Sequence, residues 1–244
     1  SGTRNAAGST ITRTGDDGST VTYAYDASRG VYVSQGQSGA QDTLAWNATA
    51  STWTWTDDAA SQQETYDASG QLTALSDTRS GAHYSFGYSG GQLHTITAGD
   101  GDTLTFGYNT AQQLSTLSIS EIPPGQGTAV TRQQVSYAYD AQGRLSTVAT
   151  LLASDTDAST ASYTTTYTYD GTSDRVASVG QDDGTVVSYT YAADAQGTYR
   201  VATVTTGRGT AASTLTLQYD LGTGTTTLTD ALGQAWTYTY DAAG

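Results

Sequence analysis

A tyrosine followed directly by an aspartate recurs along the whole chain, and this recurrence limits the possible folds more than any other feature. Six literal copies occur, at Tyr25-Asp26, Tyr66-Asp67, Tyr139-Asp140, Tyr169-Asp170, Tyr219-Asp220 and Tyr240-Asp241. Weaker copies lie between them, at Trp46-Asn47, Tyr88-Ser89, Tyr108-Asn109 and Tyr191-Ala192. Successive copies are 20 to 22 residues apart, except for three longer intervals of 28 to 31. Such a period is typical of an array built from one small structural unit.

The residues before each tyrosine predict a β-strand. In most units a second large apolar residue stands two positions earlier, as Phe86 does before Tyr88 and Tyr137 before Tyr139. In a strand, this spacing places both side chains on one face of the sheet. In a helix, the two residues would point about 200° apart, so the helical alternative is excluded.

The residues after each tyrosine predict a turn and a returning strand. Asp occupies the first position and Gly the fourth in four segments, Asp67–Gly70, Asp140–Gly143, Asp194–Gly197 and Asp241–Gly244. An Asp side chain can accept backbone N–H groups in a type I turn, and Gly then adopts the left-handed conformation. In the returning strand "RLSTV" (144–148) the apolar residues are three apart, which predicts a β-bulge. Each unit is therefore one hairpin of about twenty residues.

Placed side by side, about ten such hairpins predict an all-β fold. It consists of tandem antiparallel β-hairpin repeats of 20 to 22 residues, which form a long, twisted or spiralling β-strip. The array covers residues 1–244 as a single domain. The three longer intervals indicate loop insertions near residues 120–130, 152–160 and 205–213, and insertions that preserve the period belong at hairpin tips.

Composition removes several classes of function. The chain has 23 acidic residues against nine basic ones, all of them Arg, and a net charge of −14. So acidic a surface repels phosphate backbones, which argues against nucleic-acid binding. The absence of Cys excludes thiolate catalysis and zinc–sulfur sites. No apolar run reaches the length of a membrane span, so we expect no membrane insertion.

The repeat unit resembles a known family. "YDAQGRLSTV" (139–148) and "YDASGQLTAL" (66–75) are similar to the YD or RHS repeats of bacterial polymorphic toxins, insecticidal toxin complexes and teneurins. The resemblance covers nearly the whole chain, which looks like an excerpt of a longer array. It implies a β-strip that spirals into a hollow shell around a toxic polypeptide, or a cell-surface protein, with carbohydrate binding in some members. Shells of the family also carry an Asp-Pro cleavage site, but Pro123 and Pro124 here follow Ile122 and Pro123.

These features together predict a non-enzymatic structural segment of a secreted or cell-surface bacterial protein, with flanking repeats and an enclosed toxin polypeptide as partners. The expected structural residues are Tyr25, Asp26, Tyr66, Asp67, Gly70, Tyr88, Tyr108, Tyr139, Asp140, Gly143, Tyr169, Asp170, Tyr191, Tyr219, Asp220, Tyr240 and Asp241. Arg144 has no predicted role. Gln71 and Gln113 stand at its position in sister units, which argues against any chemistry shared at that position.

The sequence supports catalytic and metal-binding interpretations less well than the structural one. His83 and His94 lie in strand-like contexts, and the paired carboxylates, such as Asp57 with Asp58, fall in turns, where Asp is favoured for backbone reasons. We therefore predict no cofactor. Calcium is the one alternative that we keep, because carboxylates favour this cation, although no twelve-residue calcium loop occurs.

The alternative function is a carbohydrate-binding adhesin module. Trp46, Trp53 and Trp55 are concentrated in ten residues, and exposed aromatic rings could stack on sugars. The competing interpretation, which we favour, is that this face packs across neighbouring hairpins.

Overall fold

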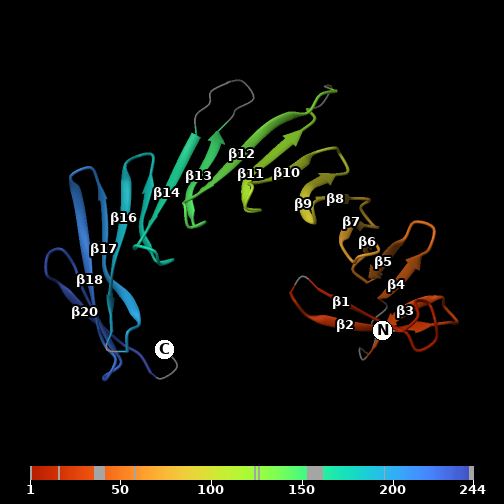
Figure 1. Cartoon of the computed structure of the whole chain (residues 1–244), viewed down its shortest axis with the longest axis horizontal. Coiled ribbons are helices and arrows are strands. Elements are labelled where there is room, and N and C mark those ends of the chain that lie inside the picture. The colour runs from red at the N-terminus through yellow and green to blue at the C-terminus, as the bar shows by residue number, and fades with distance from the viewer. Residues whose placement is uncertain are drawn as a thin grey trace. The chain divides into compact units, whose positions relative to one another are not determined.

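The computed structural model describes residues 2–15, 17–35, 42–57, 59–123, 125, 127–152, 162–194 and 196–241. These residues contain twenty β-strands and no helix (Figure 1). All the strand pairs with a defined register are antiparallel and join strands that are consecutive in the sequence, as expected for tandem hairpins. The predicted all-β hairpin fold is therefore confirmed. The chain divides into two compact units, Ser1–Phe106 with Ile119–Thr131 and Gly107–Ser118 with Arg132–Gly244.

The first ten strands pair in sequence order, each with the next. They are β1 (Thr10–Thr14), β2 (Thr20–Asp26), β3 (Val31–Ser34), β4 (Thr43–Asn47), β5 (Thr52–Asp57), β6 (Gln62–Tyr66), β7 (Leu72–Asp77), β8 (His83–Ser89), β9 (Gln92–Ala98) and β10 (Thr103–Tyr108). β11 (Leu114–Glu121) follows and contributes residues to both units.

The second unit repeats the same arrangement from β12 to β20. Its strands are β12 (Val130–Tyr139), β13 (Leu145–Leu152), β14 (Ser162–Tyr169), β15 (Val176–Gln181), β16 (Thr185–Ala193), β17 (Tyr199–Arg208), β18 (Ala211–Asp220), β19 (Thr225–Thr229) and β20 (Ala235–Thr239).

The predicted β-bulge is present, and it explains the spacing of the apolar residues. Tyr137 pairs with Val148, but Tyr139, two residues later, pairs with Leu145, three residues earlier on the returning strand. One extra residue on the returning strand therefore keeps both apolar pairs on one face of the sheet. The same register shift occurs at four other repeat tyrosines, Tyr66, Tyr88, Tyr169 and Tyr191.

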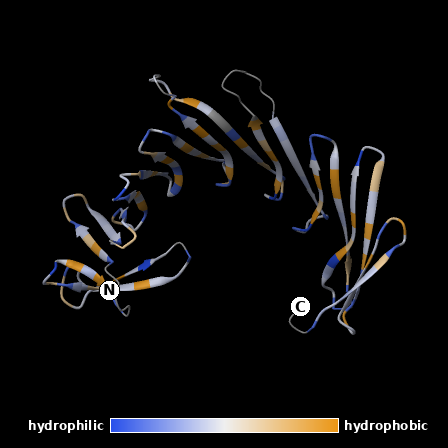
Figure 2. Cartoon of the chain, turned by 180° about the vertical axis from the view of Figure 1, so that it is seen from behind, coloured by the Kyte–Doolittle hydropathy of each residue, from blue (hydrophilic) through white to orange (hydrophobic). Residues whose placement is uncertain are grey.

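The strand registers of the second unit separate two chemically different faces. Tyr167 pairs with Val179 and Tyr189 with Val204, so aromatic and aliphatic residues share one face. The alternating positions carry mainly small and hydroxyl side chains, and the hydroxyls of Thr190 and Thr203 lie 2.7 Å apart across the strands. Figure 2 shows the apolar residues on the strands and hydrophilic residues in many of the turns.

The buried core of the described residues lies in the first unit. Tyr23, Tyr32, Leu44, Trp53 and Trp55 form one cluster, and both tyrosines are completely buried. The indole N–H of Trp55 donates to the hydroxyl of Tyr23 at 2.9 Å, which satisfies the polar tip of a buried ring. The first six strands therefore curl around an aromatic core.

The three expected insertions have different outcomes. The first expected insertion falls between β11, which ends at Glu121, and β12, which begins at Val130. Residues 153–160 lie outside the described residues. The loop predicted at 205–213 is wrong, because β17 continues to Arg208 and β18 begins at Ala211, with Arg208 paired to Ala211. Lengthening two paired strands equally preserves their register, so this hairpin grows without a long loop.

Candidate functional site

The candidate site is the set of contacts that the repeat-motif residues make within and between successive hairpins. Its first component is the Asp-containing turn, whose geometry recurs along the chain. In the turn after Tyr139, Oδ1 of Asp140 accepts the N–H groups of Gln142 and Arg144, both at 2.9 Å. The N–H of Gly143 donates to the carbonyl of Asp140, and Gly143 has a φ of 80°. A glycine adopts this left-handed conformation without the steric cost that a side chain adds.

Five turns share this pattern, in which the first side chain accepts N–H groups two and four residues later. They begin at Asp67, Asn109, Asp140, Asp194 and Asp230. The turn at Asp230 was not among the predicted turns, although it has the same Asp-x-x-Gly spacing. Asp26 and Asp220 are the last residues of β2 and β18, Asp170 directly follows β14, and Asp241 follows β20.

Hydrogen bonds hold the turn carboxylates in their ionised form. The pKa of Asp140 is lowered chiefly by the side chain of Arg144 and then by backbone N–H groups. The pKa of Asp67 is lowered first by the hydroxyl of Ser69. For Asp194, burial opposes the shift, but hydrogen bonds from Thr198 and Arg200 still lower the pKa. These aspartates are therefore acceptors in the turns, with no catalytic proton to donate near neutral pH.

The repeat tyrosines form a second set of contacts, each reaching the preceding hairpin. The hydroxyl of Tyr139 donates to the carbonyl of Leu114, and that of Tyr169 to the carbonyl of Leu145, each at 2.7 Å. In both cases the acceptor begins the returning strand of the preceding unit. Two further bonds have the same geometry, Tyr191 to Val176 at 2.7 Å and Tyr88 to Leu72 at 2.9 Å.

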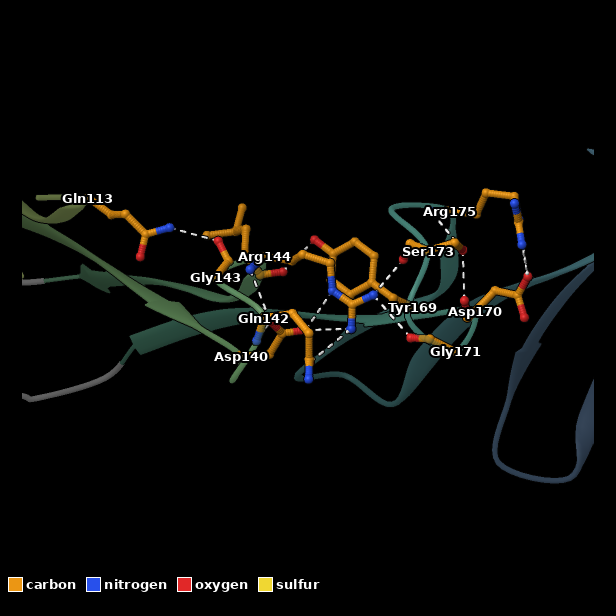
Figure 3. Close-up of polar contacts among 11 residues, drawn as sticks. Gln113, Asp140, Gln142, Gly143, Arg144, Tyr169, Asp170, Gly171, Ser173 and Arg175 are labelled. Atoms are coloured by element: carbon orange, nitrogen blue, oxygen red, sulfur yellow. Dashed lines mark hydrogen bonds and ion pairs between the residues drawn. The ribbon is translucent and has the colours of Figure 1, made fainter. Parts of the chain in front are cut away.

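Arg144 forms the third contact, toward the following hairpin (Figure 3). Its Nε donates to Asp140 at 2.8 Å, and its Nη1 donates to the carbonyl of Gly171 at 3.1 Å. The guanidinium also lies 4.3 Å from the ring centroid of Tyr169. Arg144 therefore binds its own turn, the ring of the next repeat tyrosine and the turn that follows it.

Arg144 and the Gln residues at its position in other units share a role, so the expectation that they do not is wrong. Nε2 of Gln113 donates to the carbonyl of Gly143 at 2.7 Å, and Nε2 of Gln71 to that of Gly91 at 3.5 Å. Each amide reaches a glycine in the next turn, as Arg144 reaches Gly171. Arg and Gln share a side-chain N–H donor, and sequence comparison alone could not show that both reach the same kind of acceptor.

Two later arginines continue the pattern of ring contacts. Arg175 lies 3.9 Å from the ring centroid of Tyr199 and forms an ion pair with Asp170 at 2.8 Å. Arg200 lies 5.6 Å from the ring centroid of Tyr219 and contacts Asp194 at 3.1 Å. Cation–π contacts of this kind are each worth about 0.5–1 kcal/mol when exposed, and more when desolvated.

The remaining repeat tyrosines lie in other environments. Tyr25 packs against Tyr32, with ring centroids 5.1 Å apart, and Tyr108 is half-buried at the end of β10. The N–H of Tyr240 donates to the carbonyl of Gly224, while its side chain is exposed. The hydroxyl of Tyr66 bonds to Glu64 instead of a preceding carbonyl.

The proposed sugar-binding tryptophans lie in and beside the core. Trp53 and Trp55 are only 9% and 6% exposed, and the guanidinium of Arg4 lies 3.7 Å from the ring centroid of Trp46. Trp46 and Trp53 also contact each other, with centroids 5.0 Å apart. These rings therefore pack mainly against other groups of the protein.

The other candidate groups remain separate. His83 and His94 are exposed on β8 and β9. Within the described residues, no three His, Asp or Glu side chains come together in a way that could hold a metal ion. No helix in the described part of the chain is long and apolar enough to cross a membrane.

Comparison with known proteins gives no family assignment. The sequence matches no protein-family model and no curated protein. Similar solved structures include TcdB2-TccC3-TEV, at 16% identity and a TM-score of 0.38, where the match covers 95% of this chain and 16% of that chain. They also include a porin-like protein from Bacteroides uniformis, at 14% identity and a TM-score of 0.27, where 89% of this chain and 87% of that chain are covered. The functional proposal therefore depends on the geometry of the chain itself.

Proposed function

We propose that the chain is a non-catalytic structural segment of a secreted or cell-surface bacterial YD-repeat protein, and that it forms part of a β-strip wall. The observation that carries this proposal is the use of the motif residues. Asp and Gly form the turns, Tyr bonds to the preceding hairpin, and Arg or Gln bonds to the following one. Residues used in this way act between repeats, which is the role of a structural segment.

The proposed partners are flanking repeats and an enclosed toxin polypeptide. Flanking repeats of a parent chain would continue the pattern of one hairpin bonding to the next, and a toxin polypeptide enclosed by the wall is the cargo that the family resemblance implies. The proposal includes no enzyme activity, no cofactor and no nucleic-acid partner. Immunolabelling of intact bacteria that express the parent protein tests its location, and a signal confined to lysed cells would contradict a secreted or surface wall.

Removal of one whole repeat tests the scaffold role. A deletion of residues 140–169 joins Tyr139 to Asp170 and removes one turn, β13, β14 and the residues between these two strands. Because β15 runs in the same direction as β13, β12 can pair with β15 in the original register. We expect a β circular-dichroism spectrum and a cooperative urea transition for this variant.

The matched control removes residues 145–152, which form β13 alone. This deletion reverses the direction of every later strand relative to β12, so we expect a loss of cooperative unfolding. Equal disruption by the two deletions would contradict a scaffold of interchangeable hairpins. A glycan array on the intact chain tests the adhesin alternative, and specific, saturable binding would replace the scaffold proposal.

A further inference from the structure

Two charged residues occupy positions where the repeat pattern places apolar side chains. Glu64 stands two residues before Tyr66, where other units have Tyr, Phe or Leu. Arg13 pairs with Val21 and lies two residues after Ile11, which pairs with the buried Tyr23. Both charges therefore point toward the core face of the first unit, where an apolar residue is the ordinary choice.

The two charges meet across the curl of the first unit. Nη2 of Arg13 lies 2.6 Å from Glu64, and Nε donates to Glu64 at 3.0 Å and to the Tyr66 hydroxyl at 3.2 Å. The guanidinium also lies 3.8 Å from the ring centroid of Trp55. The side chains of Arg13 and Glu64 are only 18% and 14% exposed. Burial and the neighbouring Glu64 raise the pKa of Tyr66 to about 12, so its hydroxyl stays protonated.

Stability alone does not account for this cluster. A buried ion pair often contributes no more than apolar side chains of the same volume, because both charges lose hydration. Tyr66 also departs from the pattern of Tyr88, Tyr139 and Tyr169, whose hydroxyls donate to carbonyls of the preceding hairpin. Departures from a local structural rule are expected mainly at functional sites.

A pocket of about 290 Å³ opens beside the cluster. Ile11, Leu44 and Trp53 contribute its apolar lining, and Arg13 and Tyr66 contribute polar groups. This volume is at the small end of the range for ligand sites, so it suits one ring and a short substituent.

The N–H donors of the pocket lining that have no protein partner indicate what kind of ligand would fit. Arg13 and Tyr66 engage the carboxylate of Glu64. Nε of Arg13 bonds to Glu64 and Tyr66, and Nη2 bonds to Glu64, whereas Nη1 bonds to no described residue. The site therefore offers N–H donors above an apolar surface. An anionic ligand would meet Glu64 and a chain of net charge −14, so a neutral ligand is favoured.

We propose that this pocket binds a small neutral aromatic molecule that carries one hydrogen-bond acceptor, such as a phenol or an aryl ketone. The ring would pack on Ile11, Leu44 and Trp53, and the acceptor oxygen would bind Nη1 of Arg13. This proposal concerns a site separate from the contacts between hairpins, so it does not depend on the scaffold function.

Ligand-observed NMR titration of the intact chain tests the proposal with three probes, p-cresol, toluene and benzoate. We expect saturable binding of p-cresol with a dissociation constant of order 1 mM, as befits a ligand of a few heavy atoms. Toluene lacks the acceptor, so it should bind about three- to tenfold more weakly. Benzoate should bind more weakly than p-cresol, because its charge is opposed by Glu64. A preference for benzoate, or equal binding of toluene and p-cresol, would overturn the proposed recognition.

Two variants assign the binding to this pocket. Ile11→Phe fills the apolar lining and should remove p-cresol binding, whereas Ile119→Phe, at an exposed position outside the pocket, should not. The double variant R13M/E64L removes both charges together, so it leaves no unpaired buried charge, and it should bind p-cresol and toluene equally. Circular dichroism checks that each variant is folded. Undiminished binding by a folded Ile11→Phe variant would overturn the site.

Discussion

The guanidinium of Arg144 lies 4.3 Å from the centroid of the Tyr169 ring, and this contact joins two successive hairpins. The same tyrosine donates its hydroxyl to the carbonyl of Leu145, the residue next to Arg144. Tyr169 is thus held from its face and from its tip by adjacent residues of the preceding unit. The Tyr-Asp motif and the Arg that follows it form one connected set of contacts between repeats.

Removal of the hydroxyl of a repeat tyrosine should destabilise the second unit. Tyr169→Phe keeps the ring beneath Arg144 but leaves the carbonyl of Leu145 without this donor. We expect a loss of about 1 kcal/mol in the free energy of unfolding. Urea denaturation measures it as a lower midpoint at unchanged slope. Tyr238→Phe, at a side chain that is 58% exposed, is the control and should change stability by less than about 0.5 kcal/mol.

Substitutions of Arg144 should follow the two residue types found at this position. Arg144→Gln retains an N–H donor for the next turn, as Gln113 does toward Gly143, but it should lose the contact with the Tyr169 ring and the ion pair with Asp140. Arg144→Ala loses these contacts and the bond to the next turn as well, and it should cost about 1–2 kcal/mol. Thermal unfolding ranks the variants, with the exposed Arg29→Ala as a control. A Gln variant as unstable as the Ala variant would contradict the shared donor role.

The buried tryptophans should be the most sensitive positions in the first unit. Trp53→Ala and Trp55→Ala each leave a large cavity in the aromatic cluster and should cost about 3–5 kcal/mol. Trp236→Ala, at a ring that is 47% exposed, should cost far less. The measurement is the chemical-denaturation midpoint followed by tyrosine and tryptophan fluorescence. A small effect at Trp53 and Trp55 would contradict their role in packing the core.

The turn aspartates should make the fold sensitive to acid. The pKa of Asp140 is lower in the folded chain than its ordinary value, so its carboxylate stabilises the fold above the unfolded pKa of about 3.9. That contribution is lost as the pH falls through the lower, folded pKa. Asp140→Asn keeps an Oδ1 acceptor, as Asn109 does, and should flatten the dependence of Tm on pH between about pH 5 and pH 2.

The reverse substitution is the control for this prediction. Asn109→Asp introduces a carboxylate at an equivalent turn, which already presents its Oδ1 to the N–H groups of Ala111 and Gln113. We expect a steeper fall of Tm with acid. Parallel Tm profiles for the wild type and both variants would contradict the assignment of acid sensitivity to these turns.

Local patterns were sufficient to predict the strands, turns and bulges, because each depends on residues within one hairpin. The spacing of Leu145 and Val148 predicted the register shift that the structure places opposite Tyr139. Contacts between distant strands were not predictable in this way. Arg13 and Glu64 are 51 residues apart and meet only because the first six strands curl. The one local sign was Glu64 itself, a charge at a position that is otherwise apolar.

The role of Arg144 was missed for a related reason. Its acceptors, the carbonyls of Gly171 and Ser173, belong to the next turn, so neither lies within its own hairpin. Gln at the same position in other units argued against a shared role, although a primary amide and a guanidinium both present N–H donors. The loop expected at 205–213 failed because a hairpin can lengthen by extending its paired strands.

A double-mutant cycle between Arg144 and Tyr169 tests the central claim most directly, namely that the motif residues join one hairpin to the next. The cycle compares Arg144→Met, Tyr169→Leu and the double variant by urea denaturation. We predict a coupling energy of about 0.5–1.5 kcal/mol, whereas a matched cycle between Arg144 and Tyr238 should be additive. Additivity of the Arg144 and Tyr169 substitutions within about 0.3 kcal/mol would contradict the claim.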